Sequence, residues 1–151
     1  MKLEFSGSPT IAAPRERVWE RLMDPNFLAQ SAPGVESVDT IDPTHFKVVS
    51  GFGVGSIKVR FAMVVELFDI VDQESAKMRV RGKAPGSAID VVSRMQIDDA
   101  GSSGSQLAWS ATSEVSGTVA SVGARLMEGT ARKLTEQFWT DFARRVSQEG
   151  N

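Results

Sequence analysis

The sequence has 151 residues, of which 41% are hydrophobic and 24% are charged, and its formal net charge is −2 at pH 7. These values are typical of one soluble globular domain that can bury a core, and the small negative charge gives no electrostatic reason to expect a nucleic-acid partner. The chain has no cysteine, which excludes disulfides, thiolate metal sites and cysteine nucleophiles.

The N-terminal segment carries charge at Lys2 and Glu4, which is not the pattern of a secretory signal. No run of residues approaches the length of about eighteen apolar residues that a membrane-spanning helix needs. We therefore expect a single domain over residues 1–151 in the cytoplasm.

The first part of the chain predicts one strand followed by two short helices. Apolar residues alternate over residues 3–11, which is typical of a strand, and Pro9 favours an edge position or the end of that strand. Residues 14–23 predict a helix that begins at a proline and has one apolar face, and residues 26–31 predict a second helix that ends before Pro33.

Residues 35–115 predict an antiparallel meander of about six strands separated by turns. The longest strand places Phe61, Met63 and Val65 on one face and charged residues such as Arg60 on the other. A sheet with one apolar face needs a cover, and the long helix predicted over residues 116–146 is the element that can supply it. The fold class is therefore α+β.

The apolar residues of the C-terminal helix recur at multiples of four. This spacing overshoots the helical period by about 40° each time, so the apolar stripe drifts and the two halves of the helix should face different neighbours. Gly123 and Gly129 fall inside the first half, where each glycine costs roughly 1 kcal/mol relative to alanine. They indicate either close packing or space for a ligand, whereas Phe138 and Trp139 of the second half are interpreted as core.

Small residues interrupt the inward-facing rows of the predicted sheet. If they face the glycine-containing half of the helix, either the helix approaches the sheet closely or a ligand fills the gap. Methionines at the same face suit an apolar guest of variable shape, although methionine also fills irregular core corners. The small positions are Ser50, Gly82, Ser93, Ala111 and Ser113, and the predicted cavity lining is Phe27, Phe52, Phe61, Met63, Met78, Ser93, Met95, Trp109, Ala111, Val119, Gly123, Leu126 and Met127.

Few residues could carry chemistry. His45 is the only histidine, lies beside a predicted turn and is expected on the solvated face opposite Phe46. No set of residues has the spacing of a metal site or a nucleophilic triad, so we predict no catalytic residue, no metal and no cofactor. Residues 51–55 alternate glycine with apolar residues but precede a strand rather than a helix, which predicts a hairpin turn instead of a phosphate-binding loop.

A basic stripe is predicted on the outer face of the sheet. It could dock an acidic protein surface or anionic lipid headgroups, but charges on a solvated strand more often serve solubility and edge protection. The stripe consists of Lys58, Arg60, Lys77, Arg79, Arg81, Lys83 and Arg94.

This order of elements resembles the helix-grip fold of the START-like, SRPBCC superfamily, and within it the sequence is similar to the CoxG family, the G subunit of carbon monoxide dehydrogenase. The resemblance covers nearly the whole chain, and the helix motif is its most specific part. It implies a curved, seven-stranded antiparallel sheet with two short helices and one long C-terminal helix. The residues that carry it are Ile11-Ala12-Ala13-Pro14, Val18-Trp19, Asp24-Pro25, Pro33-Gly34-Val35-Glu36-Ser37, residues 53–58, Gly123-Ala124-Arg125-Leu126, Ala131-Arg132-Lys133-Leu134 and Gln137-Phe138.

The resemblance implies an accessory protein of carbon monoxide dehydrogenase or related molybdenum hydroxylases, with a cavity for a quinone or another lipid. The resemblance assigns no catalytic residues to this sequence. It also implies transient peripheral contact with the inner face of the membrane. Two alternatives stay open at this point. One is a cyclase- or hydrolase-like enzyme that acts on an apolar substrate, using hydroxyls such as Ser50, Ser93, Ser113 and Thr130. The other is a maturation chaperone that binds its partner enzyme through the basic stripe.

Overall fold

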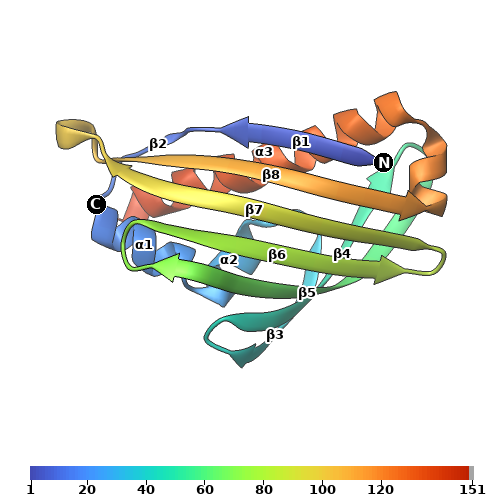
Figure 1. Ribbon diagram of the computed structural model, residues 1–151, viewed down its shortest axis with the longest axis horizontal. Coiled ribbons are helices and arrows are strands. Elements are labelled where there is room, and N and C mark those ends of the chain that lie inside the picture. The colour runs from blue at the N-terminus through green and yellow to red at the C-terminus, as the bar shows by residue number, and fades with distance from the viewer. Residues whose placement is uncertain (150–151) are drawn as a thin grey trace.

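The computed structural model describes residues 1–149 and shows a curved antiparallel sheet that wraps around one long helix (Figure 1). The strands are β1 (Lys2–Gly7), β2 (Thr10–Ile11), β3 (Val35–Asp42), β4 (His45–Val54), β5 (Ile57–Val71), β6 (Ser75–Ala84), β7 (Ser87–Asp99) and β8 (Ser105–Gly117). The helices are α1 (Arg15–Leu22), α2 (Pro25–Ser31) and α3 (Ala124–Glu149), with 3₁₀ turns η1 (Gly101–Ser103) and η2 (Thr118–Val122).

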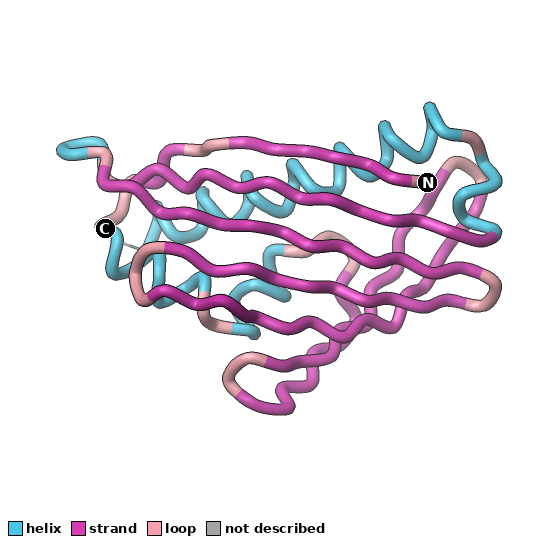
Figure 2. The backbone as a smooth tube through the Cα atoms, viewed as in Figure 1, coloured by secondary structure: helices cyan, strands magenta, loops and turns pink. Residues whose placement is uncertain are grey.

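The sheet runs in the order β1-β8-β7-β6-β5-β4-β3, with β2 also paired to β8, and every pairing is antiparallel. Figure 2 shows the long strands side by side, with α3 crossing one face of the sheet. Alternation along each strand explains this arrangement, since β8 buries every second residue from Ser105 to Val115 and exposes most of the residues between them. The predicted α+β helix-grip architecture is confirmed.

The predicted first strand is divided in two. It breaks after Gly7 and resumes at Thr10, so the structure has eight strands where seven were predicted. Pro9 lies in the break because proline has no N–H to donate to a neighbouring strand. Its carbonyl still accepts a hydrogen bond from the Leu107 N–H at 3.0 Å, which keeps the interrupted strand aligned on β8.

The long helix begins later than the sequence pattern predicted. Residues 116 and 117 still belong to β8, and η2 separates that strand from the start of α3 at Ala124. Gly117 and Gly123 have φ angles of +86° and +108°, a region that favours glycine, and they flank the turn on its two sides. Gly123 therefore lies in the turn before the helix and not inside the helix, as the sequence pattern predicted.

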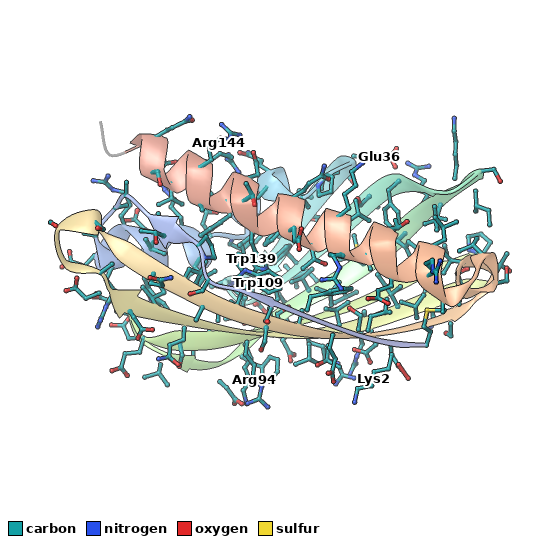
Figure 3. All side chains as sticks on the ribbon, turned by 90° about the horizontal axis from the view of Figure 1, so that it is seen from above. Lys2, Glu36, Arg94, Trp109, Trp139 and Arg144 are labelled. Atoms are coloured by element: carbon teal, nitrogen blue, oxygen red, sulfur yellow. The ribbon has the colours of Figure 1, made fainter. Side chains whose placement is uncertain are left out.

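Large side chains fill the core at the α1 end of the sheet. Phe142 is fully buried and meets Phe27 of α2 edge to face, with ring centroids 5.6 Å apart. Trp139 stacks on Trp109 of β8 with centroids 5.8 Å apart, and Figure 3 shows the two indoles between α3 and the sheet. Gly7 on β1 leaves room for Trp109, because a Cβ at that position would lie 2.8 Å from the indole nitrogen.

Helix α2 is fixed at both ends by specific hydrogen bonds. The Asp24 carboxylate accepts from the backbone N–H groups of the first turn, the usual role of an N-cap residue. At the other end Arg145 of α3 donates to the Phe27 carbonyl at 3.1 Å, the Ser31 hydroxyl at 2.8 Å and the Gln30 side-chain oxygen at 2.9 Å. These bonds hold α2 against α3. Within residues 1–149, no helix is long and apolar enough to cross a membrane.

Candidate functional site: an apolar cavity beneath the second half of α3

A cavity of about 220 Å³ lies between the sheet and α3. Protein interiors are normally packed without voids of this size, so the space is a feature that needs an explanation. Its walls come from α2 and the segment after it, from five strands, and from α3. The lining residues are Leu28, Ala29, Ala32, Pro33, Phe46, Val48, Ser50, Phe52, Met63, Val65, Met78, Val80, Val91, Ser93, Ala111, Ser113, Leu134, Thr135, Phe138 and Trp139.

The cavity exists because small side chains on β7 and β8 lie beneath α3. Ser93 pairs with Ala111 across the two strands, and Ser113 is the next inward residue on β8. Leu134 and Phe138 of α3 line the opposite wall. These helical side chains do not reach far enough to fill the space that the two serines and the alanine leave, so the seam stays hollow there.

The predicted lining is divided by the structure into two groups. Phe52, Met63, Met78, Ser93 and Ala111 line the cavity. The other predicted residues lie elsewhere, at other inward-facing strand positions, on α2, or on the segment from η2 to the first turn of α3. They are Phe27, Phe61, Met95, Trp109, Val119, Gly123, Leu126 and Met127.

Their positions follow from their neighbours. Phe27 packs on Phe142, Phe61 stacks on Phe52 with ring centroids 5.6 Å apart, and Trp109 stacks on Trp139. Met95 and Met127 are buried in the core, and Val119 is buried in η2. Leu126 is 44% exposed and lies over Gly55 in the β4–β5 turn.

The half of α3 that faces the cavity is the aromatic half, not the glycine-containing half that the sequence suggested. Phe138 and Trp139, interpreted from the sequence as plain core, both line the cavity. Added Cβ atoms at Gly123 and Gly129 would meet nothing within 4 Å, so neither glycine permits a close contact. Gly82, another predicted small position, does not line the cavity because Ile89 and Met63 pack closely around it.

Within residues 1–149, the lining contains hydroxyl groups but no charged side chain. Ser50 donates a hydrogen bond to the Pro33 carbonyl at 2.9 Å, which links β4 to the segment after α2. Ser93, Ser113 and Thr135 contribute three further hydroxyls to the walls. The cavity is therefore apolar with a few neutral polar points, a composition typical of small-molecule sites.

His45 lies outside the cavity, as predicted, on the outer face of the sheet. Its Nδ1 is 2.9 Å from an Asp42 carboxylate oxygen and its Nε2 is 3.0 Å from a Glu66 carboxylate oxygen. Hydrogen bonding to Asp42 first, and then to Glu66, raises the pKa of His45 above its usual 6.5. The same contact lowers the pKa of Asp42. This cluster joins the β3–β4 turn to β5.

The basic stripe is partly neutralised by acidic neighbours. Lys77 pairs with Asp69 at 2.9 Å, and Arg60 pairs with Glu36 at 2.8 Å. Arg79 makes a bidentate contact with Asp90, which lowers the pKa of that carboxyl. Alternating charge of this kind suits a solvated sheet face better than a uniform anion-binding surface.

Comparison with known proteins places this geometry in a family. The model of the family described as the G subunit of carbon monoxide dehydrogenase (CoxG) matches residues 7–147. The chain belongs to the CoxG family. A comparison with curated proteins found no match.

Solved structures similar to this CoxG-family chain share its whole fold. A conserved protein from Geobacillus kaustophilus is 23% identical with a TM-score of 0.85, and the alignment covers 98% of this chain and 96% of that one. A START superfamily protein from Mycobacterium smegmatis is 13% identical with a TM-score of 0.68 and 97% of each chain covered. The Zhui aromatase/cyclase from Streptomyces sp. R1128 is 14% identical with a TM-score of 0.69, covering 99% of this chain and 93% of that one. These likenesses confirm the START-like fold.

A second, open depression lies beside the cavity in this CoxG-family chain. It has a volume of about 780 Å³, runs along the outer side of α3 and is lined largely by charged and polar side chains such as Arg132, Glu136 and Arg144. Ala32 and Pro33, in the segment after α2, line both this groove and the apolar cavity. The segment after α2 therefore lies between the cavity and the groove.

Proposed function

We propose that this protein is a non-enzymatic carrier of an apolar molecule, a quinone or another lipid, and that it serves a molybdenum hydroxylase of the carbon monoxide dehydrogenase type. The observation that carries the proposal is the cavity between the small residues of β7 and β8 and the second half of α3. Binding of an apolar guest is favourable because the guest leaves water and supplies van der Waals contacts that the side chains around the cavity otherwise lack.

The size of the cavity indicates what it can enclose. An engineered apolar cavity of about 150 Å³ binds benzene, whereas sites for drug-sized ligands run from about 300 to 1,000 Å³. At about 220 Å³, the cavity suits one ring system or a short chain segment. A longer lipid would place one end inside and extend past the wall at Ala32 and Pro33.

The lining also suits flat and variable guests. Phe46, Phe52, Phe138 and Trp139 present aromatic side chains to the space. Aromatic rings favour offset stacking and edge contacts with a flat guest. Met63 and Met78 add flexible thioether side chains that adapt to irregular shapes.

Membership of the CoxG family supports the link to a carbon monoxide dehydrogenase. In this proposal the partner enzyme exchanges electrons with the bound quinone, and the carrier acquires its guest by transient contact with the inner face of the membrane. A cyclase-like reaction receives less support, because the lining within residues 1–149 offers hydroxyls without an acid or base to activate them.

The test is native mass spectrometry of the purified protein, followed by solvent extraction and identification of any guest. The same preparation, stripped of lipid, is then titrated with quinones while its thermal unfolding is followed. A co-purifying apolar guest, or a rise in the unfolding temperature with quinone concentration, supports the carrier function. The absence of both would overturn it.

A further inference from the structure

Two buried serines in the cavity lack the hydrogen bonds that the other buried serines make. Five serines are buried within residues 1–149: Ser31, Ser50, Ser93, Ser105 and Ser113. Three of them donate to a backbone carbonyl: Ser31 to Phe27 at 3.2 Å, Ser50 to Pro33 at 2.9 Å and Ser105 to Ala13 at 2.8 Å. In the same described part of the chain, Ser93 and Ser113 have no such partner, although they are only 4% and 7% exposed.

Both unpartnered hydroxyls open into the cavity. Each residue lines it, and no fully enclosed side-chain nitrogen or oxygen within the described chain lacks a hydrogen-bond partner. A hydroxyl without a partner costs free energy in an apolar environment, so two of them on one wall are unusual for a purely structural core.

The two serines lie close enough to contact the same ligand. Ser93 is directly opposite Ala111, and Ser113 is opposite Val91, so the serines are diagonal neighbours on the same face of adjacent strands. The Cα atoms of diagonal neighbours in an antiparallel pair are about 7–8 Å apart and their Cβ atoms are somewhat closer, so both hydroxyls border the space over Ala111, where each can donate to an oxygen of the same ligand.

We propose that Ser93 and Ser113 form the polar end of the cavity and recognise a neutral oxygen, a carbonyl or a hydroxyl, on an otherwise apolar ring. The proposal rests on the proposed carrier function and adds the chemistry of the recognised group. A carboxylate or a phosphate does not fit, because no cationic side chain among residues 1–149 lines the cavity to offset the cost of burying a charge. A pure hydrocarbon would leave both hydroxyls without a partner.

Three probes of similar ring size separate these cases. Menadione has a neutral dicarbonyl ring, 2-methylnaphthalene has the same two-ring skeleton without oxygen, and 2-naphthoic acid carries a negative charge. The chain has no cysteine that menadione could alkylate. Dissociation constants are measured by calorimetric titration for the wild type, Ser93→Ala, Ser113→Ala and the double variant, with Ser110→Ala on the exposed face of β8 as the control.

We expect each single change to weaken menadione binding about 2- to 10-fold, as for the loss of one hydrogen bond. Binding of 2-methylnaphthalene should stay the same or tighten, since it no longer leaves a hydroxyl unpaired. Ser110→Ala should leave the menadione preference over 2-methylnaphthalene unchanged, because this exposed side chain lies outside the cavity. The ligand-free Ser93→Ala and Ser113→Ala variants should unfold at the wild-type temperature, whereas Ser105→Ala should unfold earlier.

Other results overturn the inference in distinguishable ways. If menadione and 2-methylnaphthalene weaken equally in the serine variants, the hydroxyls do not recognise oxygen, although the carrier function stands. Tightest binding of 2-naphthoic acid would indicate an anion site and contradict the proposal. If Ser93→Ala and Ser113→Ala lower the unfolding temperature as much as Ser105→Ala, the hydroxyls have a structural role instead. If none of the three probes binds the wild type, the proposed carrier function itself is contradicted.

Discussion

The seam between α3 and the sheet has a solid part and a hollow part, and the two differ in what the sheet presents to the helix. In the solid part, Trp139, which also forms one edge of the cavity, stacks on Trp109, and Phe142 is fully buried against Phe27 of α2. In the hollow part, Leu134 and Phe138 face a wall that includes Ser93 and Ala111. The helix supplies large apolar residues in both places, so the size of the strand residues decides where the space opens.

This difference assigns separate roles to the two parts. The solid part holds α3 against the sheet and α2 through the packing of buried aromatic side chains. The hollow part lacks that packing and leaves room for a guest. Substitutions in the solid part should therefore change stability, and substitutions in the hollow part should mainly change binding.

The largest expected effect is that of Phe142→Ala in the solid part. Removal of this fully buried ring should lower the free energy of unfolding by about 3–5 kcal/mol, because the loss of apolar burial is combined with a new cavity. Phe138→Ala is the matched change beside the existing space and should cost clearly less. Denaturant unfolding measures both values, and equal losses would break the distinction between the two parts.

The next largest effect concerns the attachment of α2. Arg145→Ala removes hydrogen bonds to the Phe27 carbonyl, the Ser31 hydroxyl and the Gln30 side chain, and it should cost about 1–3 kcal/mol. Arg144→Ala is the control, since this exposed neighbour bonds to Asp141 and Gln148 on its own helix, and its effect should stay within about 0.5 kcal/mol.

The measurement for this pair is again denaturant unfolding, combined with hydrogen exchange of the α2 amides. We expect Arg145→Ala to speed hydrogen exchange selectively in α2, because the Arg145 side chain donates the hydrogen bonds that hold the C-terminal end of this helix. Exchange that is unchanged in Arg145→Ala, or changed equally in Arg144→Ala, would show that α2 is held by packing alone.

A third effect is expected from filling the hollow part. Ala111→Leu should place additional methyl groups in the cavity and weaken binding of an apolar probe such as menadione at least about tenfold, with a change in unfolding free energy within about 1 kcal/mol. Thr112→Leu, on the outer face of the same strand, is the control and should leave binding unchanged. Calorimetric titration gives both affinities, and equal binding by the two variants would place the guest elsewhere.

The smallest effect is the pH dependence of the His45 cluster. Because the pKa of His45 is raised in the folded state, its protonated ring stabilises the fold fully below about pH 6.5, and this stabilisation is lost as the pH rises through the higher folded pKa. The lowered pKa of Asp42 acts in the other direction, with stability present above about pH 3.8 and lost as the pH falls through the folded pKa.

The wild type should therefore lose a small amount of stability as the pH rises from neutral to alkaline. The His45→Gln variant should not show this loss. Thermal unfolding from pH 5 to 9 checks this expectation, with ligand binding measured in parallel. Because His45 lies outside the cavity, the binding constants of the variant and the wild type should agree at every pH. A stability profile identical to that of the wild type would contradict the role of the Asp42 and Glu66 contacts.

The sequence was sufficient to predict most of the fold. Alternating apolar residues in the strands, such as Phe61, Met63 and Val65 of β5, and the apolar stripe of the long C-terminal helix led to the helix-grip arrangement. The predicted helix began too early because residues 116–123 contain apolar residues at a helix-compatible spacing. The positive φ angles of Gly117 and Gly123 prevent a helix from beginning there. These angles belong to the turn between β8 and α3, which the spacing of apolar residues does not reveal.

The candidate site was predicted less completely than the fold. The small strand residues Ser93 and Ala111 indicated either a close approach of the helix or a space, and the sequence did not decide between the two; the structure has a space there. Which half of α3 lies above them depends on the angle at which the helix crosses the curved sheet. At the solid end Trp139 packs on Trp109 of β8, a contact between distant parts of the chain that no local pattern encodes.

The central claim is that the second half of α3 spans an apolar space in which a guest binds. A crystal structure of the protein grown with menadione tests this claim most directly. We predict density for the ring between Phe138 and the wall formed by Ser93, Ala111 and Ser113, with α3 in the same position as without the guest. A structure in which Leu134 and Phe138 contact those small residues directly and leave no space would contradict it.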